Sequence, residues 1–142
     1  MKIEVFAICD AATDYGGRLN ILGAFEGIAA PQEPVVGERC SVVTRMRFNS
    51  AEEGEHSISV RFIDQDGGNV IPEMNANFPV KMPPGRESMA LNLVLNIARI
   101  QFNRFGEYEV NLFVDGEQKA SLPLTIAQGR RIDMPPPAPP EN

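Results

Sequence analysis

The stretch GEYEVNLFVDGEQKASLPLTI, residues 106–126, decides the predicted fold. Apolar side chains recur at every second position along residues 108–114 and 120–126, and Asp115-Gly116 separates the two runs. Because side chains alternate between the two faces of a strand, each run predicts a strand with one buried face. Asp-Gly tolerates the positive φ angles of a two-residue hairpin turn. The stretch therefore predicts a β-hairpin.

Tyr108 follows the start of this hairpin closely, in the order Gly106-Glu107-Tyr108. This arrangement resembles the corner of immunoglobulin-like sandwiches, where a tyrosine hydroxyl donates a hydrogen bond back to the main chain. We therefore expect the Tyr108 hydroxyl to bond to the backbone at the entry to this strand.

The same period of two continues outward through the chain. Residues 40–48, 56–64, 74–82 and 88–99 each alternate apolar and polar side chains and predict strands, with Pro79 marking an edge or a bulge. A helix is the rival interpretation of the leucine-rich run 88–99, but five apolar residues at consecutive odd positions fit a strand better. The polar segment 49–55 is typical of a hairpin loop between its neighbouring strands.

The first hairpin is expected around AATDYGG, residues 11–17, with Gly16 and Gly17 at positive φ and Asp14 capping the turn. Cys9 precedes this turn and should pack on the face of Ile3, Val5 and Ala7. A reactive thiolate needs a nearby cation or a helix N-terminus, and the local sequence supplies neither. Cys9 is therefore interpreted as a structural residue.

These signals predict an all-β fold. About eight strands without a credible helix favour a two-sheet antiparallel β-sandwich, either immunoglobulin-like or jelly-roll-like. The domain would span residues 1–128, and residues 129–142 would form a proline-rich tail that cannot build a core.

Length, composition and net charge limit the partners and the compartment expected for this protein. The chain has 142 residues, 43% of them apolar, and a net charge of -6, which disfavours nucleic acid and anionic membrane as partners. No signal peptide or membrane span is apparent, so Cys9 and Cys40 are expected to be reduced and the protein to be cytoplasmic. No cofactor or metal is expected.

An anion-binding patch is one candidate site. Arg45, Arg47 and Arg61 lie on the polar faces of two strands that are expected to be neighbours, and Arg39 is close in sequence. Such a cluster could recognise an anion. The alternative is a solvated sheet face whose arginines are balanced by Glu52, Glu53 and Glu55.

A self-association surface is a second candidate, because the first two strands carry apolar residues on both faces. A sandwich strand normally exposes one face to solvent. Because the outer face of these strands is also apolar, it must be covered by the chain itself or by another subunit. The expected interface, most simply of a homodimer, consists of Phe6, Ile8, Leu22 and Ala24.

His56 is the candidate residue for catalysis or metal binding. A hydrolytic or metal site would have to use His56, the single histidine, and we expect no enzyme because one histidine at a loop edge is usually solvated.

The tail could adopt the extended conformation that aromatic grooves of peptide-recognition domains bind, through Pro135, Pro136, Pro137, Pro139 and Pro140.

Three stretches together resemble a family of small uncharacterised bacterial proteins: residues 6–28 with Cys-Asp-Ala-Ala and Leu-Asn-Ile-Leu-Gly-Ala-Phe, residues 52–67, and residues 106–116. The resemblance spans about residues 1–127 and implies a β-sandwich domain without an assigned activity or site. The leading hypothesis is a non-enzymatic module that acts through protein contacts and self-associates. A small-molecule or anion-binding domain is the alternative.

Overall fold

The computed structural model describes residues 1–130 and 138–141. Within these residues the chain forms eleven strands and a single 3-10 turn, η1 (Ser50–Glu52). The strands are β1 (Lys2–Tyr15), β2 (Arg18–Ala24), β3 (Gly27–Ala30), β4 (Val35–Gly37), β5 (Cys40–Asn49), β6 (Gly54–Ile63), β7 (Met74–Val80), β8 (Ser88–Ile97), β9 (Ile100–Phe102), β10 (Gly106–Val114) and β11 (Glu117–Gln128). The described part of the chain contains no helix long and apolar enough to cross a membrane.

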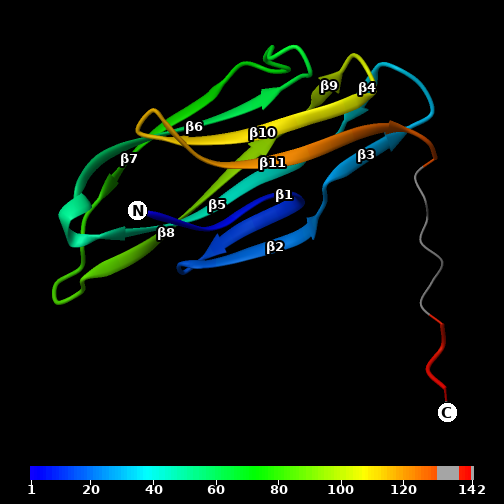
Figure 1. Ribbon diagram of the computed structural model, residues 1–142. Coiled ribbons are helices and arrows are strands. Elements are labelled where there is room, and N and C mark those ends of the chain that lie inside the picture. Colours follow the sequence, from blue (N-terminus) through cyan, green and yellow to red (C-terminus); the bar gives the residue numbers. More distant parts are fainter. Residues whose placement is uncertain (131–137, 142) are drawn as a thin grey trace.

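The strands are arranged in three sheets (Figure 1). Four strands form one sheet in the order β2-β1-β5-β8, five form another in the order β3-β11-β10-β6-β7, and β4 pairs with β9. The all-β prediction is confirmed, but the expectation of about eight antiparallel strands in two sheets is wrong. β3, β4 and β9 have only three or four residues each, too few to show alternation, and β3 runs parallel to β11.

The two larger sheets each contribute one face to a single apolar core. Every inward residue predicted from residues 40–48, 58–62 and 108–126 is buried in that core or packed against it. β10 and β11 pair through Asp115-Gly116, with φ of 51° and 78°, so the last hairpin is confirmed. Tyr108 is buried and its hydroxyl donates to the Arg104 carbonyl at 2.6 Å, as the corner pattern predicts.

The connection from β5 to β6 differs from the prediction. Residues 49–55 do not form a hairpin loop, because β5 belongs to the four-stranded sheet and β6 to the five-stranded sheet. Asn49 and Glu52 instead close a capping box around η1. A short polar segment suits either a hairpin or a crossing between sheets, and only packing of the flanking apolar faces decides between them.

A β-bulge in β1 changes which side chains face the core. The pairing of β1 with β5 shifts register between Ile3 and Val5, which leaves Glu4 as the extra residue. One extra residue moves every later side chain to the opposite face. Phe6 and Ile8 therefore join Ile3 at the core, and the prediction that Cys9 shares the face of Ile3 is wrong.

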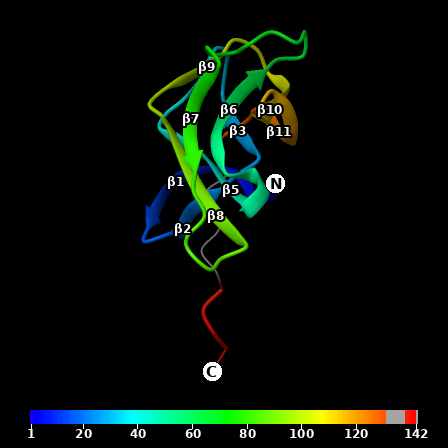
Figure 2. The same cartoon turned by 90° about the vertical axis from the view of Figure 1, so that its left-hand side faces the viewer.

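The β1–β2 hairpin folds back against its own sheet. Asp14 Oδ1 accepts from the Gly17 amide at 3.0 Å, and Gly16 and Gly17 have positive φ, so the predicted turn is confirmed. The Gly17 carbonyl accepts from Arg45 Nη1 at 3.2 Å and from Asn92 Nδ2 at 3.1 Å. These two bonds fasten the turn to β5 and β8, and the hairpin projects beside those strands in Figure 2.

Candidate functional site

The predicted arginine patch does not form one surface. Arg45 and Arg47 lie on β5, and both bind Glu4 of β1, with Nε–Oε distances of 3.2 and 2.9 Å. The pKa of Glu4 is lowered, first by the hydrogen bond from Arg47 and then by Arg45. These two guanidinium groups thus share one carboxylate of the same sheet, which offsets one of their two positive charges.

Arg61 lies on β6, in the other large sheet. Its Nε donates to Glu73 Oε1 at 2.9 Å, and its guanidinium carbon lies 4.0 Å from the centroid of the Phe113 ring. Arg39 stands apart from the other three, in the connection between β4 and β5. The expectation of neighbouring strands fails because β5 and β6 separate at η1, which places these arginines in two different sheets.

The four residues of the predicted interface are split by the bulge in β1. Ile8 is buried in the core and Phe6 is half-buried against it, so neither lies on an outer face. Leu22 is 70% exposed, and Ala24 is also exposed. The outward-facing part of the predicted surface is therefore carried by β2.

The proline tail is described in part. Pro139 and Pro140 are exposed and have no regular secondary structure, whereas Pro135, Pro136 and Pro137 lie outside the described residues. The predicted contact of this tail with a peptide-recognition domain stays a prediction.

His56 is held by two hydrogen-bond acceptors. The sequence predicted a solvated histidine at a loop edge, and the structure differs from that prediction. Nδ1 lies 2.6 Å from Asp115 Oδ2, and Nε2 lies 2.6 Å from the Glu52 carbonyl oxygen. The ring also packs against Phe48, with centroids 4.9 Å apart. Both nitrogens face acceptors, so the doubly protonated ring satisfies both bonds. His56 consequently has no nitrogen left to act as a base.

This arrangement predicts a pH-dependent stability. The Glu52 carbonyl and then the Asp115 carboxylate raise the pKa of His56 above its ordinary value of 6.5. The stabilisation is fully present below about pH 6.5 and is lost as the pH rises through the raised pKa of the folded state. We expect wild-type protein to lose unfolding free energy between mildly acidic and mildly alkaline pH, and His56→Gln to lose less.

Proton NMR can measure this pKa directly, because the chain has a single histidine. Asp115→Asn is the matched variant and should lower the measured pKa, since it removes the charged acceptor. A pKa of 6.5 or below in the wild-type protein would contradict the assigned hydrogen bonds.

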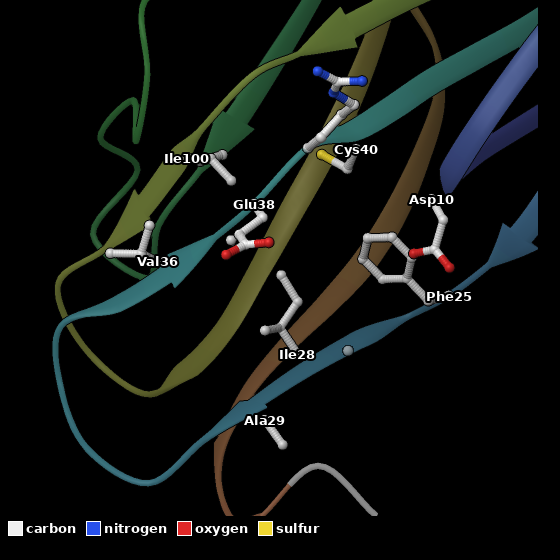
Figure 3. A pocket seen from close by; sticks show the side chains of 11 residues that line it. Asp10, Phe25, Ile28, Ala29, Val36, Glu38, Cys40 and Ile100 are labelled. Carbon is white, nitrogen blue, oxygen red and sulfur yellow. The ribbon is translucent and has the colours of Figure 1, made fainter. Parts of the chain in front are cut away.

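A concave site of about 660 Å³ lies where β3, β4 and β9 meet the bend of β1. Asp10 and Phe25 line one side, whereas Val36 and Glu38 line the other (Figure 3). The remaining lining residues are Gly27, Ile28, Ala29, Gly37, Arg39, Cys40 and Ile100. We call this site the β3–β4 pocket.

The floor of the β3–β4 pocket is apolar and its rim is charged. Ile100 and Cys40 are buried, with 2% and 4% of their surface exposed, whereas Asp10, Glu38 and Arg39 are exposed. Burial, and then the charges of Cys9 and Asp10, raise the pKa of the Cys40 thiol to about 11. The thiol is therefore protonated at neutral pH, where it is a poor nucleophile. The pocket is suited to binding through shape and charge.

Sequence reasoning missed the β3–β4 pocket. Its lining residues come from strands of three or four residues and from the connections between them, none of which shows a period. Gly37 is the one local signal, because a Cβ there would lie 3.0 Å from Ile100 Cγ2. A glycine at a close approach between elements is visible in a sequence, but its partner is not.

Comparison with solved structures gives a weak structural similarity. The chain aligns with Pseudomonas fluorescens alkylpurine DNA glycosylase AlkC bound to DNA containing an abasic site analog, at 11% identity and a TM-score of 0.42. The alignment covers 89% of this chain and 30% of that chain. At this TM-score the similarity carries no argument about function.

The sequence comparison is more informative. No curated protein is significantly similar to this chain. A family model matches residues 4–127, which confirms the predicted resemblance to a family of uncharacterised proteins. The chain belongs to a family of unknown function, DUF6941.

Proposed function

We propose that this chain is a non-enzymatic module that acts through protein contacts and associates with a second copy of itself through β2. The observation that carries this proposal is the distribution of exposed apolar side chains. Of the four large apolar side chains exposed in the described residues, three lie on the β1–β2 hairpin: Tyr15, Ile21 and Leu22. Tyr15 is 77% exposed and Leu22 is 70% exposed.

The position of β2 supports pairing between strands. β2 is an outer strand of its sheet, so one side of its backbone is open to another strand. Arg18 is its single charged residue and lies at its first position. Antiparallel pairing of two β2 strands around Ile21 would keep the two Arg18 side chains apart. β8 is also an outer strand, but its leucines are half-buried against the core.

Two features support a role without catalysis. Both nitrogens of His56 are engaged, and the Cys40 thiol has a pKa raised to about 11 by burial and then by Cys9 and Asp10. Cys9 and Cys40 are free and buried, which fits a reducing compartment such as the cytoplasm.

The test is the solution mass of Leu22→Glu, measured by light scattering over a concentration series. We expect the wild-type protein to be a dimer and Leu22→Glu to be a folded monomer, because a carboxylate at the centre of an apolar contact must be desolvated. Leu22 is 70% exposed, so the substitution should leave the core intact.

Val36→Glu is the matched control. Val36 is the fourth exposed apolar side chain, at 40% exposure, and it lies on β4 outside the hairpin. This variant should remain a dimer. A monomeric wild-type protein, or a dimer that survives Leu22→Glu, would refute association through β2.

A further inference from the structure

The β3–β4 pocket combines an apolar floor with a mostly acidic rim. From this combination we infer that it binds a small organic cation, an amine carried on an apolar body. Its volume of about 660 Å³ is within the range of pockets that hold small molecules. The inference is independent of association through β2, because neither Tyr15, Ile21 nor Leu22 lines the pocket.

The floor supplies the apolar contact. Phe25 and Ile28 pack against the core, and Ile100 belongs to it, so these side chains are already held in position. Cys40 is 4% exposed, lines the pocket with its thiol, and makes no hydrogen bond within the described residues. A neutral thiol is a weak hydrogen-bond partner and an adequate apolar neighbour. The floor therefore favours a hydrocarbon group over a strongly hydrated one.

The rim supplies the charge. Asp10 at the bend of β1 and Glu38 after β4 bring two carboxylates to the pocket from different elements (Figure 3). Within residues 1–130 and 138–141, neither carboxylate has an ion-pair or hydrogen-bond partner, in contrast to Glu4, Glu73 and Asp115, which are all paired. Two unpaired carboxylates at the rim attract a positively charged group, and the apolar surface beside them can hold the hydrocarbon part of the same ligand.

Arg39 supplies too little positive charge for the pocket to favour an anionic ligand. It is the one guanidinium among the lining residues, which include two carboxylates. An anion would gain one favourable charge contact and oppose two like charges, whereas a cation meets the reverse balance. Calcium and magnesium ions normally take six or more oxygen ligands and gain nothing from an apolar floor. Within the described residues, no group of three or more His, Cys, Asp or Glu side chains could hold a metal ion. An alkylammonium ion uses both parts of the pocket.

The experiment titrates full-length, isotope-labelled protein with three probes of equal chain length: hexylammonium, hexanoate and hexanol. Amide NMR shifts report both affinity and location. We expect hexylammonium to bind most tightly and to shift resonances of residues 25–40 and 100. Glu38→Gln and Asp10→Asn should each weaken its binding about three- to tenfold, because each removes one charge-assisted contact.

Two more variants make the result decisive. Arg39→Gln should tighten hexylammonium binding, because it removes the like charge. Glu109→Gln replaces an exposed carboxylate of β10 outside the pocket and should leave the affinity unchanged. The inference is overturned if hexylammonium does not bind, if hexanoate binds as tightly, or if Glu38→Gln and Asp10→Asn have no larger effect than Glu109→Gln. The amide spectrum of each variant shows whether it is folded.

Discussion

Phe102→Ala is expected to lower the free energy of unfolding by about 3–5 kcal/mol, the largest effect of any single substitution discussed for this protein. The Phe102 side chain is fully buried and meets Tyr108 edge to face, with ring centroids 4.9 Å apart. It pairs across the small sheet with Val35, which is also buried. Removing the ring leaves a cavity that this rigid neighbourhood cannot fill.

Urea unfolding followed by circular dichroism measures this cost. Gln101→Ala is the control, because Gln101 lies on the same strand with its side chain exposed, and it should change stability by less than about 0.5 kcal/mol. Equal effects of the two substitutions would mean that the β4–β9 sheet is not part of the core.

Gly23→Ala is expected to lower the free energy of unfolding by about 2–3 kcal/mol. Gly23 has φ of 68°, and this left-handed conformation costs a residue with a Cβ about 1–2 kcal/mol. The new Cβ would also lie 2.4 Å from Asp10 Oδ2 and 2.9 Å from its Cγ. Moving Asp10 out of its preferred rotamer adds about 1 kcal/mol. The same displacement should weaken binding of hexylammonium, because Asp10 lines the β3–β4 pocket.

Gly16→Ala separates these two contributions. Gly16 has φ of 57°, but a Cβ there has no atom within 4 Å, so the conformational cost acts alone. Thermal unfolding of both variants should show Gly23→Ala to be the less stable by about 1 kcal/mol. If both variants lose the same stability, Gly23 is needed for its φ angle alone and the contact with Asp10 is without consequence.

Local patterns were reliable wherever the interacting residues are close in sequence. The turns at Gly16-Gly17 and Asp115-Gly116 are confirmed, and so is the bond from the Tyr108 hydroxyl to the Arg104 carbonyl. Pro79 lies on β7, an outer strand of its sheet, as its missing amide donor predicts. Each of these features depends on a few neighbouring residues whose chemistry can be read directly.

The predictions failed wherever one extra residue changes the face on which side chains lie, or one connection changes the sheet that a strand joins. The extra residue at Glu4 turned Phe6 and Ile8 inward, and a strand with apolar residues on both faces gives no sign of such a bulge. The crossing at η1 placed Arg61 in a different sheet from Arg45 and Arg47. The β3–β4 pocket was invisible because strands of three or four residues carry no period.

The sequence alone therefore determined the all-β class, the long strands with their inward faces from Cys40 onward, and the chemistry of the tight turns. Alternation and turn propensity are local properties, and burial of one face stabilises them in any sheet arrangement. The tertiary structure decided which sheet each strand joins, the face of Phe6 and Ile8, the partners of His56 and the assembly of the β3–β4 pocket. These depend on contacts between residues far apart in the chain, and their energies arise only when the two large sheets and the small one pack together.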